Sequence, residues 1–338
     1  MEDVDFGYQF RIVGPVTNDR KLVSAVAVFE AYSRCEDRAR VHEESYLSAF
    51  YFDEGFREHL KTAQTTRGFQ GATWSPWIWF DIDRDQSEGG IDKALTDVRR
   101  LGETLVGTFG VPDEQLVSFF SGSKGFHLGC PTSLWAPAGG PAFHRLARAF
   151  AEIVAGEAQI RIDTGIYDAV RAFRAPNSRH PKTGLHKRFI PSGQLGVLTA
   201  EDILDLGRSP APFELPVDFE VGRFDGLVEA WREAEAQVAD QDAAAAQRRA
   251  AGPGAAVRVN PLTLDVIRSC NVTVGDRHRS VYSAARNLGE CGASRELTIG
   301  LLTEGARDLG LPPKDVARQI ECGWKDGQPP LSTDGSCS

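Results

Sequence analysis

The sequence predicts an α+β protein in which mixed sheets are flanked by helices, followed by a small unit made only of helices. Short apolar runs with strand character alternate with amphipathic helices as far as residue 222, and only helical periodicity is present from Asn260 onward. Between these parts, residues 227–256 are rich in Ala, Glu, Gln and Arg, and they contain Gly252-Pro253-Gly254. This composition is typical of a helix that leads into a flexible linker.

Four segments follow from these changes in composition. We expect a large core at residues 1–222, an Ala-rich helix and flexible linker at 223–256, a helix-bundle domain at 257–328 and a disordered tail at 329–338.

The core shows a regular succession of elements. Residues 77–82 (WIWFDI) form a continuous apolar and aromatic run that is typical of a buried strand, and an amphipathic helix follows at 91–105. Further strands are predicted at 117–120 and 126–129, on either side of a tight turn. Pro141 precedes the next helix, because proline is favoured in the first helical turn.

The last part of the chain is predicted to be helical throughout. Pro261 marks one helix start, and Pro313 begins a last helix that reaches about Trp324. Between them, residues 297–309 carry one apolar stripe, and a second stripe is formed by Val281, Ala284, Ala285 and Leu288.

Composition limits the classes of function. The chain has 338 residues, a hydrophobic fraction of 41% and a charged fraction of 25%, as in ordinary globular proteins. No apolar run approaches the ~20 residues of a membrane span, and the acidic N-terminal region has no signal-peptide core. We therefore expect a cytoplasmic protein with no membrane partner. The net charge of −9 argues against a general polyanion binder, whereas the acid-free stretch Arg171–Arg188 indicates a local anion site.

Six cysteines are scattered along the chain and none forms a CxxC pair. This spacing supports neither a disulfide framework nor a zinc knuckle, so we expect no structural zinc. Buried, unpaired cysteines acting as small hydrophobes are the main interpretation. The alternative is a Cys3His site from Cys270, His278, Cys291 and Cys322.

A pair of acids ends the first buried strand. Asp81 and Asp83 are two residues apart, so their side chains point to the same side of the strand. Two carboxylates this close repel each other unless a cation lies between them, and Mg²⁺ or Mn²⁺ accepts such oxygens readily. The alternative is a polar strand end that leads into a solvated loop.

A glycine-bracketed turn follows the second strand. Residues 121–127 (SGSKGFH) offer two hydroxyls, a cation, an imidazole and a backbone that can approach an anion closely. A phosphate is the natural ligand for this set. The spacing matches neither a P-loop nor a dinucleotide-binding fingerprint, and an ordinary hairpin turn with a structural histidine is the alternative.

The basic stretch is preceded by a third acid. Asp163 ends the sequence IRID, which predicts a short strand end. In the stretch that follows, Pro176 and Pro181 restrict the backbone, so its cations are expected to be held in place rather than to move freely in solvent.

Taken together, these segments resemble the archaeo-eukaryotic primase superfamily, which includes the primase-polymerases of plasmids and phages. The family's hDhD strand matches Phe80–Asp83, its SGxxGxH turn matches Ser121–His127, and its hydrophobic residue followed by an acid matches Ile162-Asp163. A downstream R/K…PxSxHxKTG segment matches Arg174, Pro176, Ser178, His180, Lys182, Thr183 and Gly184. The resemblance covers roughly residues 45–190, and the unit at 257–325 is more weakly similar to the helix bundle that follows the core in plasmid and phage members.

The resemblance implies a primase-like catalytic core and a DNA primase or primase-polymerase. Such an enzyme makes and extends primers on single-stranded DNA by two-metal nucleotidyl transfer with release of pyrophosphate. The metal ligands for two Mg²⁺ or Mn²⁺ ions would be Asp81, Asp83 and Asp163. The triphosphate of an NTP or dNTP would be held by Ser121, Ser123, Lys124, His127, Arg174 and His180, with Lys187 nearby. A replicative helicase is a further partner compatible with the family. Many relatives carry a zinc module near the second motif, where this chain has only Cys130.

Other interpretations stay open at this point. A replication initiator that binds DNA without catalysis would keep the fold, and a metal-dependent nuclease would share the acids without needing a triphosphate clamp. The helical unit, with Arg277, His278, Arg279 and Arg286, is a second contact for template or initiating nucleotide, or else a capping or oligomerisation bundle. Ribonucleotides and deoxyribonucleotides are equally compatible with these motifs.

Overall fold

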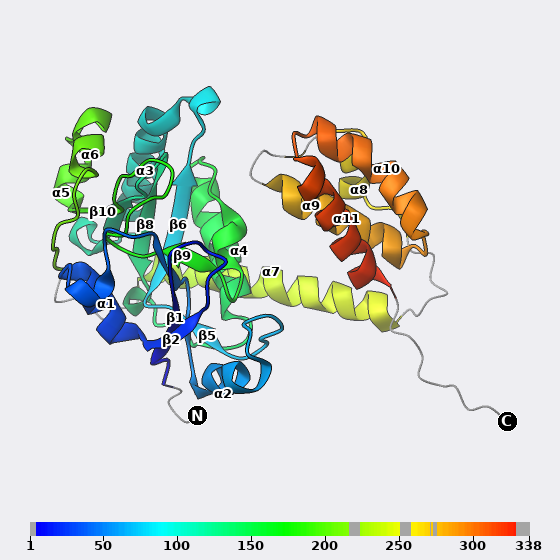
Figure 1. The fold of residues 1–338 in the computed structure, drawn as a ribbon, viewed down its shortest axis with the longest axis horizontal. Helices are drawn as coiled ribbons and strands as arrows, with labels where there is room; N and C mark the ends of the chain where they lie inside the picture. The colour runs from blue at the N-terminus through cyan, green and yellow to red at the C-terminus, as the bar shows by residue number, and fades with distance from the viewer. Residues whose placement is uncertain (1–4, 216–223, 251–257, 271, 273–275, 329–338) are drawn as a thin grey trace. The chain divides into compact units, whose positions relative to one another are not determined.

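The computed structural model describes residues 5–215, 224–250, 258–270, 272 and 276–328 (Figure 1). The chain divides into two compact units, Met1–Asp242 and Ala243–Ser338. The first unit contains antiparallel sheets together with helices, as an α+β fold requires. No helix in the described part of the chain is long and apolar enough to cross a membrane.

Two antiparallel sheets form the centre of the first unit. One has the order β5-β4-β1-β3-β9, with β2 paired to β1, and its strands are β1 (Tyr8–Val13), β2 (Lys21–Ser24), β3 (Ser45–Ser48), β4 (Tyr51–Phe52), β5 (Thr73–Trp74) and β9 (Ala172–Arg174). The other has the order β10-β7-β8-β6, and its strands are β6 (Trp77–Asp83), β7 (Val117–Phe120), β8 (Gly125–Pro131) and β10 (Arg188–Ile190).

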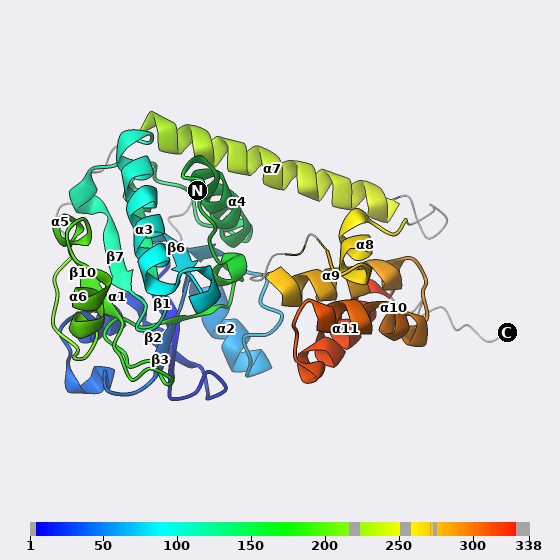
Figure 2. The ribbon, with the colours of Figure 1, turned by 90° about the horizontal axis from the view of Figure 1, so that it is seen from above.

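Strand β6 alternates between two environments. Ile78, Phe80 and Ile82 are at most 1% exposed and pack into the main core, whereas the odd-numbered residues point to the opposite face. The apolar face is covered by α3 (Gly90–Gly107) and α4 (Phe143–Glu157), which lie on one side of β6 and β7, with β1, β2 and β3 on the other (Figure 2). The odd-numbered face of β6 therefore looks towards the first sheet.

Aromatic side chains join the two sheets. Phe173 on β9 lies 5.9 Å from Trp79 on β6 and 4.3 Å from His127 on β8, measured between ring centroids. Strand β9 belongs to one sheet and β10 to the other, so residues 175–187 connect them. The predicted basic stretch therefore lies at the junction of the two sheets.

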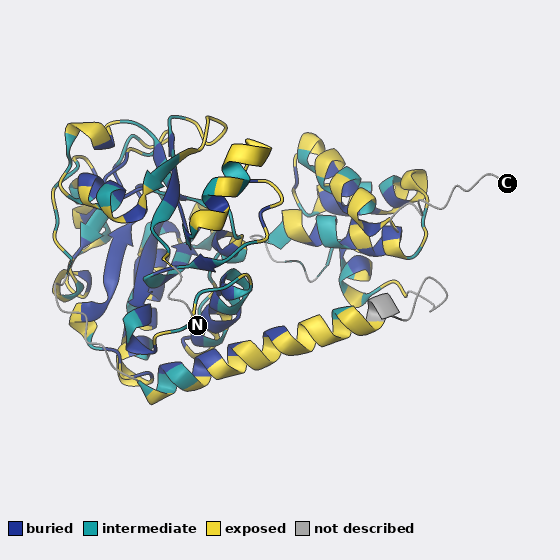
Figure 3. Ribbon diagram, turned by 90° about the horizontal axis from the view of Figure 1, so that it is seen from below, coloured by how far each residue is buried: buried dark blue, intermediate teal, exposed yellow. Residues whose placement is uncertain are grey.

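The remaining helices of the first unit surround this centre. They are α1 (Ala25–Ser33), α2 (Glu54–Ala63), α5 (Ser192–Leu195), α6 (Ala200–Leu206) and the first part of α7 (Asp225–Ala250). Helix α7 buries Leu227, Trp231 and Val238 in the main core, and residues 239–244 are exposed (Figure 3).

The described residues of the second unit, beyond the end of α7, form helices around a small apolar cluster. These are α8 (Pro261–Ile267), α9 (Arg277–Glu290), α10 (Arg295–Asp308) and α11 (Pro313–Gly327). The predicted stripe of α9 is buried, because Val281, Ala284, Ala285 and Leu288 are at most 4% exposed. Close helix packing requires glycine at Gly323, where a Cβ would lie 2.2 Å from the carbonyl oxygen of Tyr282.

Two sequence predictions need correction. Asp163 does not end a strand; it precedes the short 3₁₀ helix Thr164–Tyr167 and accepts a hydrogen bond from the backbone N–H of Gly165. The cysteines are not uniformly buried: Cys130 is 0% exposed, whereas Cys322 is exposed on α11. The proposed linker residues Gly252–Gly254 and the tail 329–338 lie outside the described residues.

Candidate active site

The acids and the glycine-bracketed turn face each other across one pair of strands. In the antiparallel register of β6 and β8, Asp81 lies opposite His127 and Asp83 lies opposite Gly125. Directly opposed residues in such a pair point to the same face of the sheet. The His127 Nε2 atom accordingly lies 3.6 Å from Asp81 Oδ1. The first two predicted motifs therefore belong to one surface.

Asp163 joins this surface from a different segment. Its backbone N–H donates a 2.8 Å hydrogen bond to the carbonyl oxygen of Asp81, although Asp163 is not part of a strand. The following 3₁₀ helix is fixed to the same strand, because the Tyr167 hydroxyl donates a 2.5 Å hydrogen bond to the carbonyl oxygen of Trp79. Three predicted metal ligands are thus neighbours in the fold.

The electrostatics of these acids reflect their crowding. Burial raises the pKa of Asp81 well above its usual range, and the nearby charges of Asp83 and Asp163 raise it further. Burial also raises the pKa of Asp83, against the lowering effect of Lys124. The Asp81 Oδ1 atom is buried and has no hydrogen-bond partner. A buried carboxylate oxygen of this kind, among other acids, is suited to a cation.

The described residues contain no group of three or more His, Cys, Asp or Glu side chains already in metal-binding geometry. Asp163 Oδ1 accepts a 2.7 Å hydrogen bond from the backbone N–H of Gly165. Asp81 and Asp83 fit a divalent ion by their convergence and by the orphaned oxygen. As a third ligand, Asp163 could offer its other carboxylate oxygen, because an ionised carboxylate accepts at both of its oxygens.

The turn at residues 121–125 requires its glycines. A Cβ on Gly125 would lie 2.2 Å from the carbonyl oxygen of Ile82 and 2.3 Å from Asp83 Oδ1, closer than any real contact. Gly122 has φ +85°, a left-handed conformation that side chains disfavour. The turn is closed by a 2.9 Å hydrogen bond from Ser121 N–H to the carbonyl oxygen of Gly125. Its backbone can therefore approach the acids of β6 closely.

The polar side chains of this turn differ in their access to solvent. Lys124 is exposed, and its Nζ lies 2.7 Å from Asp85 Oδ1 and 3.7 Å from Asp83 Oδ2. Ser123 is half-buried, whereas Ser121 is 7% exposed and its hydroxyl oxygen has no hydrogen-bond partner. The lysine thus already lies beside an acid that we expect to bind metal.

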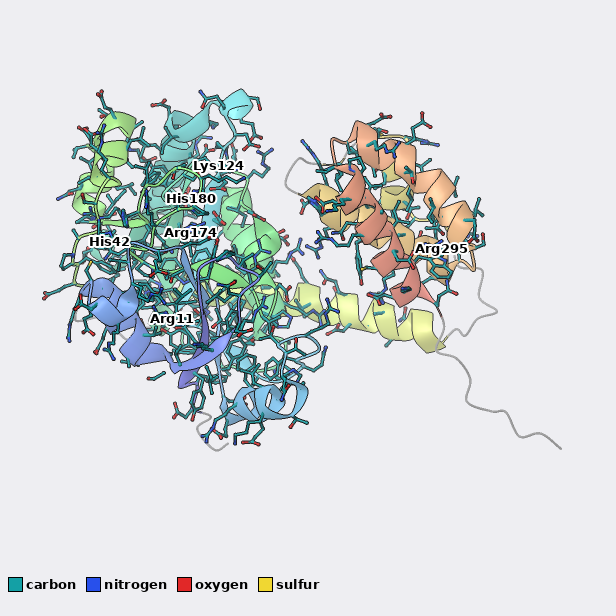
Figure 4. The ribbon with its side chains drawn as sticks, in the orientation of Figure 1. Arg11, His42, Lys124, Arg174, His180 and Arg295 are labelled. Atoms are coloured by element: carbon teal, nitrogen blue, oxygen red, sulfur yellow. The ribbon has the colours of Figure 1, made fainter. Side chains whose placement is uncertain are left out.

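A second set of cations comes from the connection between β9 and β10. The guanidinium of Arg174 lies 5.0 Å from the centroid of the Tyr46 ring. Burial lowers the pKa of both His127 and His180, and the charge of Arg174 lowers each of them further. Figure 4 shows Lys124, His180 and Arg174 in the same region of the first unit. The segment is fixed to the glycine-bracketed turn by a 2.5 Å hydrogen bond from the Thr183 hydroxyl to the Gly122 carbonyl oxygen.

His180 presents one ring nitrogen as a donor. Its Nδ1 faces the backbone N–H groups of Lys182 and Thr183 at 3.2 and 3.3 Å and accepts from them, so the proton of the neutral ring is on Nε2. Burial lowers the pKa of His180 to about 4, with the charge of Arg174 as a further cause. At neutral pH this histidine can donate a hydrogen bond to an anion but carries no charge.

Lys187 lies inside the protein rather than at the surface. It is 2% exposed, and its Nζ lies 4.2 Å from the Phe173 ring centroid and 4.9 Å from that of Phe119. The same atom donates a 3.0 Å hydrogen bond to the Arg174 carbonyl oxygen. Burial lowers the pKa of Lys187 well below its usual range, while the charge of Asp81 opposes this effect. Lys187 therefore interacts electrostatically with the buried Asp81 and is almost inaccessible to solvent.

Ser178 of the downstream motif and its neighbour Asn177 have structural roles. Ser178 is 0% exposed, and its hydroxyl lies within hydrogen-bonding distance of the carbonyl oxygens of Ser45 and Ala175, to which it donates. Its neighbour Asn177 has φ +58°, and its side-chain amide donates to the carbonyl oxygens of Tyr32 and Ala211. These bonds hold the backbone of the connection in place.

The sequence did not identify several residues that contribute to the site. Tyr46 on β3 contacts Arg174, and Phe173 stacks on His127. The charge of Arg171 opposes the effect of burial, which raises the pKa of Asp81. Arg171 and Phe173 lie within the basic stretch that the sequence singled out, but nothing in the sequence around Tyr46 indicates its contact with Arg174, because that contact depends on the pairing of β3 with β9.

Comparisons with known proteins give little support for any assignment. No family model matches the chain, and no curated protein matches it. Among solved structures, the crystal structure of primase RepB' is similar with a TM-score of 0.35 and 14% identity, over 95% of this chain and 90% of that chain. A TM-score this low does not establish a shared fold. The function has to be inferred from the site.

Proposed function

We propose that this protein is a DNA-dependent nucleotidyltransferase, a primase or primase-polymerase that uses divalent metal ions. The observation that supports this most directly is the convergence of three acids from two segments beside a glycine-bracketed turn and a fixed set of cations. The acids are Asp81, Asp83 and Asp163, and Asp81 keeps a buried oxygen without a hydrogen-bond partner.

In this proposal, Asp81, Asp83 and Asp163 hold Mg²⁺ or Mn²⁺. The bound ions would lower the pKa of a primer 3′-hydroxyl and neutralise charge on the triphosphate during in-line attack on the α-phosphate, which releases pyrophosphate. The rigid strand β6 fixes the spacing of its two carboxylates, and this limits the reorganisation needed when a substrate binds.

The cations around the acids would bind the triphosphate. Lys124 is exposed and near Asp83, so it can turn from Asp85 to a phosphate without large movement of the backbone. Arg174 supplies a planar guanidinium, and His180 supplies a neutral donor. The buried hydroxyl of Ser121 and the half-buried hydroxyl of Ser123, together with the backbone of the turn, would complete the phosphate site, with His127 beside Asp81.

Lys187 has a different role in this proposal. Because it is buried under aromatic rings, it would balance the charge of Asp81 rather than contact the nucleotide. The charge of Lys187 lowers the pKa of Asp81 against the effect of burial, which would favour the ionised, metal-binding form of the acid.

The test is nucleotide incorporation on a single-stranded DNA template. The full-length chain would be incubated with Mg²⁺ or Mn²⁺ and with NTPs, dNTPs or their mixture, in the presence and absence of a primer. We expect the wild-type chain to incorporate nucleotides into products that lengthen with time, and we expect Asp83→Asn to abolish this synthesis. Plasmid nicking without added nucleotide would favour a nuclease instead, and DNA binding without synthesis would favour a non-catalytic initiator.

A further inference from the structure

Arg84 connects the segments that carry the candidate site. It directly follows Asp83 at the end of β6, in a loop where an arginine would ordinarily be exposed, yet it is 5% exposed. A buried arginine needs hydrogen-bond acceptors for its planar group of N–H donors. The partners of this guanidinium therefore reveal what it holds together.

Those partners come from three parts of the first unit. Arg84 Nη1 donates a 2.7 Å hydrogen bond to the carbonyl oxygen of Asp83, and Nη2 donates a 2.7 Å hydrogen bond to that of Arg161. Nε donates a 2.8 Å hydrogen bond to Asp97 Oδ2 on α3. The guanidinium therefore joins the end of β6 to the segment two residues before Asp163, with α3 as support.

The backbone of Arg84 contacts the fourth segment of the site. Its N–H donates a 3.2 Å hydrogen bond to the carbonyl oxygen of Lys124, in the glycine-bracketed turn. Arg84 forms an ion pair with Asp97, whose side chain is 3% exposed. The Oδ1 atom of Asp97 also lies 2.6 Å from Lys93 Nζ. Because Asp97 neutralises it, Arg84 is suited to fix geometry rather than to supply charge to the acids.

We propose that Arg84, oriented by Asp97, is a positioning residue that sets the distance between the carboxylates of β6 and Asp163, and hence the affinity of the site for its divalent ions. This inference rests on the proposed function. The segment of Asp163 is also held by the bonds from Asp163 N–H to Asp81 and from the Tyr167 hydroxyl to Trp79. Neither of these reaches the end of the strand at Asp83, which the Arg84 guanidinium joins to Arg161.

The variant Arg84→Lys separates charge from geometry. Lysine keeps the ion pair with Asp97, but it lacks the fork that reaches two carbonyl oxygens at once. The matched control is Arg99→Lys: Arg99 lies on α3 and donates to the carbonyl oxygens of Leu195 and Leu198, at 2.8 and 2.6 Å, away from the acids. Each variant removes a guanidinium that bridges two backbone carbonyl oxygens, but only that of Arg84 lies at the candidate site.

The measurement is Mn²⁺ binding to the full-length chain, followed by the electron paramagnetic resonance signal of free Mn²⁺. We expect Arg84→Lys to weaken Mn²⁺ binding by about tenfold, the effect typical of residues that orient metal ligands, and Arg99→Lys to leave it unchanged. In nucleotide incorporation, Arg84→Lys should lower kcat at limiting Mn²⁺ without raising the KM for nucleotide. Excess Mn²⁺ should restore its rate but not that of Asp83→Asn.

Unchanged Mn²⁺ binding in Arg84→Lys, or equal weakening in both lysine variants, would overturn the inference while leaving the metal site intact. If the wild-type chain and Asp83→Asn bind Mn²⁺ equally, the proposed function itself fails. Should Arg84→Lys not fold, Asp97→Asn provides the same test, because it leaves the arginine in place but removes the charge that orients it. Weaker Mn²⁺ binding in this variant supports the inference, and unchanged binding refutes it.

Discussion

The replacement Asp81→Asn should stabilise the metal-free protein while abolishing nucleotide incorporation. The Asp81 side chain is 14% exposed, and burial together with the charges of Asp83 and Asp163 raises its pKa. A carboxyl group whose pKa is raised on folding stabilises the fold at acid pH, and this stability is lost as the pH rises through the folded-state pKa. As the pH rises, the cost of ionising this buried acid therefore opposes folding, and asparagine, which does not ionise, removes that opposition.

The size of the effect follows from the strand geometry. Side chains two residues apart on a strand are separated by roughly 6.6 Å, so Asp81 and Asp83 repel each other by about 2.5 kcal/mol at an effective dielectric constant near 20. The attraction between Asp81 and Lys187, which the variant loses, offsets part of this gain. We expect a net gain of about 1–2 kcal/mol, which corresponds to a rise in Tm of roughly 2–8 °C for a unit of this size.

Calorimetry with and without metal tests both halves of this prediction. In EDTA, Asp81→Asn should unfold at a higher temperature than the wild type, and the difference should shrink as the pH is lowered, because the wild-type acid then becomes protonated. Mn²⁺ should raise the Tm of the wild type but not that of the variant. Glu103→Gln, at an exposed acid on α3, is the control that should change neither quantity.

A lower Tm for Asp81→Asn in EDTA would refute the electrostatic reasoning, since it would show that the ionised carboxylate is already compensated in the metal-free fold. Undiminished nucleotide incorporation by the same variant would refute the assignment of Asp81 to the metal site. The two results are independent, so either part can fail alone.

Three further predictions test other parts of the site. Gly125→Ala should lower the free energy of unfolding by about 1–3 kcal/mol or more in urea titrations, because its Cβ would overlap the Ile82 carbonyl oxygen, whereas Gly107→Ala, with no neighbour within 4 Å, should not. Lys187→Met should raise the urea midpoint and lower incorporation; the gain in stability should be larger at pH 6 than at pH 9, since burial lowers the pKa of this lysine and its charged form is the disfavoured one. A gain that grows with pH would contradict this. Arg174→Gln should raise the KM for nucleotide about tenfold in steady-state incorporation, and an effect on kcat alone would exclude ground-state binding of the triphosphate by Arg174.

Local patterns predicted the parts of the site that a single hairpin builds. Alternation along β6 placed Asp81 and Asp83 on one face, and the glycines of the turn indicated a close approach of the backbone. Both features depend on residues near each other in the sequence, and the register of β6 with β8 then brings His127 opposite Asp81. Short-range geometry was sufficient here.

The sequence was less informative wherever a role depends on distant segments. Lys187 resembles any other cation of the basic stretch, and only the meeting of Phe119, Phe173 and Trp79 buries it. Arg84 lies in an acidic loop and would be expected in solvent, but Asp97 on α3 and the carbonyl oxygen of Arg161 hold it inside. The strand character of Asp163 was wrong for a similar reason: a backbone hydrogen bond to β6 fixes this residue without a strand of its own.

The order of the motifs along the chain reflects how the two sheets divide the site. The sheet of β6 and β8 carries two acids and the glycine-bracketed turn, whereas Arg174 lies on β9 in the other sheet and pairs across to Tyr46 on β3. Acids and cations from separate sheets can face each other only if the sheets are held together, and Phe173, between Trp79 and His127, is the residue that packs at this junction. In the proposed function, the affinity for an anion beside the acids would therefore depend on the packing between the sheets as much as on the charged residues themselves.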